Sequence, residues 1–167
     1  MPLNHLDQSG RARMVDISGK PQTERTATAT GRIYLKPETL RRIQKGGVAK
    51  GDVLAVAQVA GVMAAKQTPN LIPLCHPLLL SGVEMHFKED PVPDSENRCS
   101  IAITATVKTF GQTGVEMEAL TAVCVAALTI YDMCKAVDRE MSFGEIKLAS
   151  KTGGKSGTHH REVKRKK

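Results

Sequence analysis

Residues 113–138 of this 167-residue chain read TGVEMEALTAVCVAALTIYDMCKAVD. Between Glu118 and Asp132 the run contains no charged side chain, no Gly and no Pro, and it is filled mainly by Ala, Leu, Val and Thr. Such a composition predicts a helix that is covered on nearly every face. The run has thirteen residues, whereas a helix needs about 20 apolar residues to cross a bilayer. We therefore expect a core helix rather than a membrane anchor.

The polar residues at the two ends of this helix need a separate explanation. Thr113 and Glu116 have the spacing of a capping box, which would satisfy the first free N–H groups of the helix. Asp132 and Lys135 are three residues apart and should be neighbours near the C-terminal end. An ordinary surface ion pair is one interpretation. The other is an acid/base couple with a partly desolvated lysine, because the surrounding YDMCKAV is not typical of an exposed segment.

Glu118 and Asp132 lie within about 40° of each other on a helical wheel, at about 100° per residue. They are nevertheless about 21 Å apart along the axis, at 1.5 Å per residue. One small substrate bound to one chain could not contact both. An antiparallel pair of these helices across a two-fold axis would bring Glu118 close to Asp132 of the partner subunit. Small side chains that would permit such a close approach are Ala119, Ala122, Ala126 and Ala127.

The rest of the chain predicts the order β-α-α-β-β-α-β. The expected elements are a strand at 26–34, a helix from Pro37 to Gly46, a helix from Asp52 that Pro69 ends, an extended segment at 67–80, strands at 83–88 and 101–107 joined by a turn at 90–97, and a last strand at 141–148 with a bulge at Gly144. This order predicts an α+β fold of the ferredoxin-like βαββαβ type with an extra helix. Its antiparallel sheet should be covered by helices on one face and carry Thr on the other.

Length and charge indicate one domain and anionic partners. We expect a single domain over residues 1–157, with an arm at 1–24 and a basic, disordered tail at 158–167. The formal net charge is +7, but much of the excess lies in REVKRKK at the end, which leaves a mildly basic domain suited to a nucleotide. The start lacks the basic and apolar regions of a secretion signal, and the four cysteines form no CxxC pair. A reducing cytoplasm is the simplest location.

The segment LIPLCHP at 71–77 places Cys75 and His76 in a proline-stiffened loop. Pro77 favours an extended conformation of His76, which fixes the direction of its ring. A buried thiol beside an incidental surface histidine is the alternative. No second Cys or His lies at ligand spacing, so zinc is a weak interpretation, and the deaminase signature is absent. We predict no metal site.

Four basic residues could bind an anion: Arg25, Lys50, Lys66 and Lys155. Each one alone has the simpler interpretation of a solvated surface charge. Lys50 comes just before an expected helix N-terminus, where anions bind readily. GGKSG at 153–157 resembles the end of a phosphate loop, but Ala149 stands where the first Gly of that motif would be, and no helix follows. A flexible loop that carries Lys155 over a phosphate stays open.

Several long strings together resemble the molybdenum-cofactor biosynthesis protein C (MoaC) family of cyclic pyranopterin monophosphate synthases. They are MVDIS (14–18), KGDVLAVAQVAG (50–61), LIPLCHPL (71–78), residues 113–138 and GGKSG (153–157). The resemblance implies a ferredoxin-like lyase that converts 3′,8-cyclo-7,8-dihydro-GTP into cyclic pyranopterin monophosphate with release of diphosphate. It also implies a homohexamer, a trimer of dimers, with its site at a subunit interface.

The same resemblance implies the roles of particular residues. Asp132, Lys135 and Lys50 match catalytic positions. Positions that contact the substrate are matched by Leu74, Cys75, His76, Met117 and Glu118, and with weaker support by Glu116, Arg25 and Lys155. No cofactor is implied, although a Mg²⁺ ion that accompanies the triphosphate stays open. The expected partners are a nucleotide-derived small molecule and further copies of the chain, with neither nucleic acid nor membrane.

An RNA-binding module is the main alternative, because an RNA-recognition motif has the same βαββαβ order and the chain is basic. Such modules stack bases on aromatic side chains of their central strands. Residues 98–108 contain no aromatic residue, and the first strand offers only Tyr34. The sequence therefore disfavours RNA binding. A structural or regulatory protein of the same fold with an inactive site is the second alternative.

Overall fold

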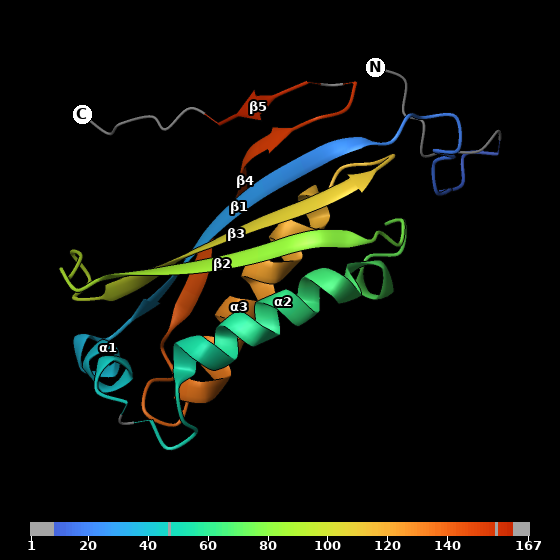
Figure 1. Cartoon of the computed structure of the whole chain (residues 1–167). Helices are drawn as coiled ribbons and strands as arrows, with labels where there is room; N and C mark the ends of the chain where they lie inside the picture. The colour runs from blue at the N-terminus through green and yellow to red at the C-terminus, as the bar shows by residue number, and fades with distance from the viewer. Residues whose placement is uncertain (1–8, 47, 156, 162–167) are drawn as a thin grey trace.

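The computed structural model describes residues 9–46, 48–155 and 157–161 (Figure 1). Its elements are β1 (Thr23–Leu35), α1 (Pro37–Gln44), α2 (Val53–Leu71), β2 (Leu80–Asp90), β3 (Cys99–Gly111), α3 (Glu116–Cys134), β4 (Ser142–Thr152) and β5 (His159–His160). Within this described part, the strands form one antiparallel sheet in the order β2-β3-β1-β4-β5. The predicted α+β fold with a ferredoxin-like strand order is confirmed.

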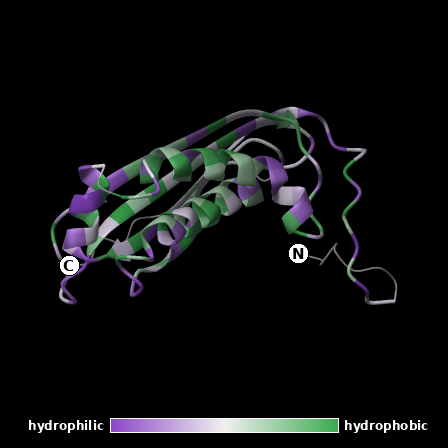
Figure 2. Ribbon diagram, turned by 90° about the horizontal axis from the view of Figure 1, so that it is seen from below, coloured by the Kyte–Doolittle hydropathy of each residue, from purple (hydrophilic) through white to green (hydrophobic). Residues whose placement is uncertain are grey.

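Helices α2 and α3 cover one face of the sheet, and α3 is the core of the domain (Figure 1). Ala119, Ala122, Val123, Ala126 and Ile130 of α3 are fully buried. α3 is long and apolar enough to cross a membrane, but 56% of that stretch is buried against the rest of the described chain. Apolar residues recur along both helices (Figure 2). The prediction of a covered core helix is confirmed.

Two glycines allow these layers to approach closely. A Cβ on Gly61 of α2 would lie 3.2 Å from the carbonyl oxygen of Ala122 and 2.7 Å from Cε of Met85. A Cβ on Gly31 of β1 would lie 2.6 Å from Cγ1 of Val123. All three distances are shorter than ordinary van der Waals contact, so glycine sets the spacing between α2, α3 and the sheet.

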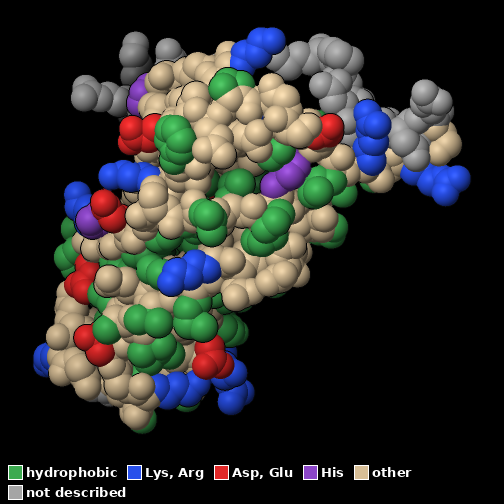
Figure 3. All heavy atoms as spheres, turned by 45° about the vertical axis from the view of Figure 1, so that its right-hand side comes forward, with side chains coloured by type: hydrophobic (Ala, Val, Ile, Leu, Met, Phe, Trp, Pro, Cys, Tyr) green, Lys and Arg blue, Asp and Glu red, His purple; other side chains and the backbone are tan. Residues whose placement is uncertain are grey.

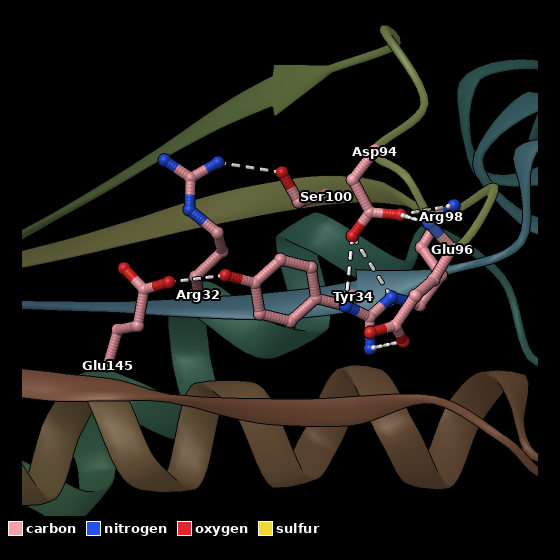
Figure 4. A network of polar contacts seen from close by, with 7 residues as sticks. All are labelled: Arg32, Tyr34, Asp94, Glu96, Arg98, Ser100 and Glu145. Carbon is pink, nitrogen blue, oxygen red and sulfur yellow. Dashed lines mark hydrogen bonds and ion pairs between the residues drawn. The ribbon is translucent and has the colours of Figure 1, made fainter. Parts of the chain in front are cut away.

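The other face of the sheet is polar, as expected. The hydroxyls of Thr28 and Thr106 lie 3.0 Å apart across β1 and β3. Further along the sheet, Tyr34 donates a hydrogen bond to Glu145, and the guanidinium of Arg98 lies 4.8 Å from the centre of the Tyr34 ring (Figure 4). The bond to Glu145 is the main reason why the pKa of Tyr34 is raised. This face thus holds its tyrosine in a fixed polar network.

Pro69 does not end α2, so that prediction was wrong. The helix continues to Leu71, and the N–H of Ile72 closes the last turn on the carbonyl of Thr68 at 2.9 Å. A proline so close to the end removes only one backbone hydrogen bond. The expected extended segment at 67–80 therefore begins only after residue 71.

The capping box was also wrong. α3 begins at Glu116 with Val115 as its N-cap, and no side chain caps it. The carboxylate of Glu116 instead accepts a hydrogen bond from Nζ of Lys151 at 2.8 Å. An ion pair with a neighbouring strand has displaced the local interaction that the spacing predicted.

The last long strand and the two ends of the chain differ in part from expectation. The pairing of β1 with β4 shifts between Thr30 and Arg32, next to Gly144, which confirms a bulge there. The residue with left-handed backbone is Glu145, at φ 53°. β5 lies in the predicted disordered tail and pairs with Ser150 and Lys151 of β4. Residues 1–8 of the arm and 162–167 of the tail lie outside the described residues.

Candidate functional site

One cluster of charges lies at the C-terminal end of α3. Nζ of Lys135 is 2.7 Å from Oδ1 of Asp132, and Nζ of Lys50 is 2.7 Å from Oδ2. Lys50 also donates to the backbone carbonyl of Asp132 at 3.0 Å. Lys50 comes from the loop between α1 and α2, where Gly51 has a φ of +95° that favours glycine. The structure therefore brings the three predicted catalytic residues together, with one lysine on each carboxylate oxygen.

The lysines determine the protonation states in this cluster. Hydrogen bonds from Lys135 and then Lys50 lower the pKa of Asp132 to about 2. In turn, Asp132 raises the pKa of Lys135. The interpretation of Lys135 as a partly desolvated lysine was wrong for the isolated chain, because its side chain is 54% exposed. At neutral pH the cluster is a carboxylate held between two ammonium groups.

The lowered pKa of Asp132 predicts a pH dependence of stability. A carboxyl group whose pKa falls on folding stabilises the fold above its unfolded value and loses that contribution as pH falls through the folded value. The window here lies between the ordinary 3.8 and about 2. We expect the free energy of unfolding of wild type and Asp132→Asn to converge over this window in urea titrations. High salt should shrink the difference at neutral pH, because the pair is half exposed. A difference that does not change from pH 6 to pH 2 would contradict the prediction.

A second cluster lies around the first turn of α3. Glu118 is 3% exposed, and burial raises its pKa, with the charge of Glu116 adding to the rise. Burial and the charge of Glu118 also raise the pKa of Cys75. Met117 and Leu74 are 37% and 39% exposed. The sequence segments around 75 and 117 thus meet at this end of the helix.

In the isolated chain, the buried carboxyl group of Glu118 should lower the free energy of unfolding at neutral pH. A carboxyl group whose pKa rises on folding stabilises the fold below its unfolded pKa, and this contribution is lost as pH rises through the folded value. Glu118→Gln is therefore expected to raise the Tm at pH 7, by about 2–4 °C if the gain is ~1 kcal/mol. The difference from wild type should vanish near pH 4 in calorimetry. Glu116→Gln is the matched control, since it loses the ion pair with Lys151 and should not stabilise.

His76 and the N-terminal arm form one side of this end. Nε2 of His76 lies 2.8 Å from the carbonyl oxygen of Val15. A surface hollow of about 430 Å³ is lined by this histidine, Gln112 and residues of the arm: Met14, Val15, Asp16, Ile17 and Ser18. The arm thus contributes to the region of the predicted substrate contacts.

Arg25 and the glycine-rich segment lie near the same turn of α3. Nε of Arg25 donates to the carbonyl of Gly111 at 2.8 Å, and Nη2 donates to that of Gln112 at 3.2 Å. Gly154 has a φ of +73°, which favours glycine, and a Cβ there would lie 1.9 Å from Nη1 of Arg25 and would displace the guanidinium. Lys155 is exposed, whereas Lys151 donates a hydrogen bond to Glu116.

Lys151 is the basic residue that sequence reasoning missed. It pairs with Ala27, whose side chain is buried, so it lies on the helix-covered side of the sheet. The pairing of β1 with β4 shifts a second time between Thr28 and Ala29. This irregularity interrupts the alternation after Leu148, so no periodicity in the sequence could have placed Lys151 on the inner side.

A single chain does not unite the two clusters, because Glu118 and Asp132 are about 21 Å apart along α3. A larger hollow, of about 530 Å³, lies elsewhere and contains none of the predicted site residues. Its charged side chains are largely satisfied by each other. For example, Lys36 pairs with Glu140 at 3.1 Å, and Arg98 pairs with Glu96 at 3.0 Å. We therefore place the candidate site at the two ends of α3.

Fold and charge clusters together define a ferredoxin-like α+β enzyme domain that carries acid/base groups at both ends of one core helix. The sequence model described as the MoaC family matches residues 14–154. The chain belongs to the MoaC family. It is 61% identical to a protein of Thermoanaerobacter sp. (strain X514) named cyclic pyranopterin monophosphate synthase, over 98% of this chain and 100% of that protein. It is 60% identical to a protein of the same name from Brevibacillus brevis, over 97% of this chain and 98% of the relative. These comparisons support the predicted function and not the RNA-binding alternative.

Proposed function

We propose that this chain is a cyclic pyranopterin monophosphate synthase of molybdenum cofactor biosynthesis. Its substrate is 3′,8-cyclo-7,8-dihydro-GTP, and diphosphate is released. The observation that carries the proposal is the Asp132 carboxylate held at 2.7 Å by both Lys50 and Lys135. Full-length similarity to relatives of that name supports the same conclusion.

The residues suit both halves of this reaction. In the phosphate step, an oxygen of the ribose-derived hydroxyl forms a bond to the α-phosphorus, and the bond to the β-phosphate oxygen breaks. Diphosphate leaves with the electron pair of that bond, and the hydroxyl proton passes to a base. The ammonium groups of Lys50, Lys135 and Lys151 can neutralise the charge that builds up on the phosphates.

Rearrangement of the purine-derived ring into a pterin requires proton transfers. Lys135 is charged and partly accessible, so it can donate a proton and take one back. Asp132 stabilises the charged form of that lysine, as the raised pKa of Lys135 indicates. Glu118 and His76, at the other end of α3, are candidates for holding the rest of the substrate.

The active form that we propose is a homohexamer, a trimer of dimers, with each site shared between two subunits. The large distance between the two clusters on one chain supports a shared site. The four alanines expected to let two α3 helices approach, Ala119, Ala122, Ala126 and Ala127, are all buried within the chain, so that contact was wrong. Apolar side chains gather elsewhere on the surface (Figure 3), and Val56, Val59 and Met63 of α2 are 44–60% exposed. Their spacing along one helix face suits a subunit contact.

We also propose a cytoplasmic location and a bound Mg²⁺ only as a companion of the triphosphate. All four cysteines, Cys75, Cys99, Cys124 and Cys134, are free, which fits a reducing compartment. The described residues contain no group of three or more His, Cys, Asp or Glu that could hold a metal ion. Mg²⁺ commonly binds through substrate phosphates and water rather than through a protein cage.

The direct test is incubation of the purified chain with enzymatically made 3′,8-cyclo-7,8-dihydro-GTP, followed by oxidation and detection of the fluorescent pterin. Wild type should give product together with one equivalent of diphosphate. Absence of both, with a folded protein, would favour the alternative of an inactive relative. Filter retention of RNA at two salt concentrations serves as the second measurement. Tight binding that Tyr34→Ala abolishes would favour the RNA-binding module instead.

A further inference from the structure

Asp138 is a buried carboxylate that the proposed reaction does not use. Its side chain is 1% exposed. Oδ2 accepts hydrogen bonds from the backbone N–H of Lys36 at 2.9 Å and from Oγ1 of Thr39 at 3.1 Å. Oδ1 accepts one from the N–H of Glu140 at 3.2 Å. The Asp138 side chain therefore binds the start of α1 and the segment that follows α3.

Helix α1 depends strongly on this anchor. Its N-cap residue, Lys36, provides no side-chain cap, and the Asp138 carboxylate, from a distant part of the chain, instead accepts hydrogen bonds from the N–H of Lys36 and the hydroxyl of Thr39. The helix has only eight residues, and only Thr39 and Leu40 are buried. A helix of this length is not stable without tertiary contacts. Loss of the Asp138 carboxylate should therefore free the N-terminal turn of α1.

Asp138 also lies next to the end of α3 that carries Asp132 and Lys135. The N–H of Asp138 donates to the carbonyl of Cys134 at 3.1 Å, which folds the segment after α3 into a tight turn. From the far end of α1, the chain leads to Lys50, whose ammonium group returns to Asp132 at 2.7 Å. The contact of Asp138 with Lys36 and the contact of Lys50 with Asp132 thus both attach this part of the chain to the C-terminal end of α3.

We propose that Asp138 is a positioning residue that fixes the Nζ of Lys50 against the Asp132 carboxylate by anchoring α1 to the end of α3. It acts through Lys50 and does not touch the substrate. Displacements of about 1 Å in a catalytic group can lower a rate by about 10²-fold. Loss of the anchor should therefore lower the rate by displacing Lys50 from Asp132. The catalytic part of the inference rests on the proposed function, whereas the geometric part does not.

A purely structural role is the rival explanation, because buried carboxylates with several hydrogen bonds also stabilise folds. The nearest cation to Asp138 is Nζ of Lys36, at 4.0 Å, and that group lies closer to Glu140, at 3.1 Å. Both explanations predict a lower Tm for Asp138→Ala. Only the positioning role predicts a change at Asp132 that depends on the presence of Lys50.

The experiment compares Asp138→Ala with wild type by ¹³C NMR titration of the Asp132 carboxyl group. As Lys50 withdraws, the pKa of Asp132 should rise from about 2 toward its ordinary value of 3.8. The kcat of the folded fraction should fall by about 10–100-fold. In a Lys50→Met background, the same substitution should change kcat less than about twofold, because both changes act through one group.

Asp94→Ala is the matched control. Asp94 also closes a turn, by accepting hydrogen bonds at 2.9 Å from the N–H groups of Glu96 and Arg98. Its loss should lower the Tm without changing the pKa of Asp132. If Asp138→Ala does not fold, Thr39→Val, which removes one hydrogen bond to Asp138, and Asp138→Asn take its place.

An unchanged pKa of Asp132 in a folded variant would overturn the inference. An undiminished loss of kcat in the Lys50→Met background would also overturn it. The NMR titration needs no turnover, so it separates this inference from the proposed function. If wild type made no pterin but the pKa of Asp132 rose in Asp138→Ala, the positioning role would stand and the proposed reaction would not.

Discussion

Replacement of Asp132 by Asn is expected to lower kcat by about 10²–10⁴-fold, the range of general acid–base catalysis. The amide keeps the shape of the carboxylate but cannot hold two ammonium groups at 2.7 Å. Lys135 should then lose the main cause of its raised pKa, so its proton becomes easier to remove. The two lysines also repel each other once the anion between them is gone.

The measurement is the rate of pterin formation under saturating substrate, with Tm and oligomer size as checks on folding. Asp132 is 55% exposed, so the substitution should leave the core intact. Asp94→Asn is a suitable control, because Asp94 is a carboxylate that pairs with a cation, Arg98, away from both clusters. A kcat for Asp132→Asn within threefold of wild type would remove Asp132 from the catalytic machinery.

Mixing two inactive variants is expected to restore activity. If each site takes Glu118 from one subunit and Asp132 from the partner subunit, a hybrid dimer of Glu118→Gln and Asp132→Asn has one intact site and one doubly altered site. Random pairing makes half of the dimers hybrid, so about a quarter of the wild-type activity should return. This result follows from the distance of about 21 Å between the two groups along α3.

The hybrids should be formed by partial unfolding and joint refolding, with different affinity tags on the two variants to confirm them. Asp132→Asn mixed with Lys135→Met provides the matched control, because these two positions lie in one cluster of one subunit, so every site of a hybrid dimer would carry one of the two defects. Equal recovery in the two mixtures would show that recovery does not depend on which ends of α3 are combined. No recovery in confirmed Glu118→Gln/Asp132→Asn hybrids would contradict a site that takes Glu118 from one subunit and Asp132 from the other.

The sequence was sufficient for the fold because its strongest signals come from burial. Alternation along β1 and β3 and the uncharged run of α3 each reflect a face that must avoid water, and no local interaction competes with that requirement. Asp132 and Lys135 could be paired from helical spacing alone. The contact of Lys50 with Asp132 had no such signal, and only the family resemblance indicated it.

The wrong predictions share a physical cause. Pro69 and the pair Thr113 and Glu116 were interpreted from local rules, but local effects of about 1–3 kcal/mol yield to tertiary contacts. Glu116 gains an ion pair with Lys151 on another strand, and α2 loses only one hydrogen bond at Pro69. The burial of Lys135 was misjudged for a related reason, since burial of a side chain at a helix end depends on how the following turn folds.

Because α2 and α3 cross closely at Gly61, the tilt of α2 depends on the size of the residue at this position. A side chain at Gly61 would press on the carbonyl of Ala122, which is backbone and cannot yield as the tip of Met85 can. α2 would then tilt about this contact. Its first residue is Val53, three residues after Lys50, so the tilt would move Lys50 as well. Gly61→Ala would in this way displace the N-terminal end of α2, which lies roughly 12–15 Å away along the rigid helix, and with it the lysine that faces Asp132.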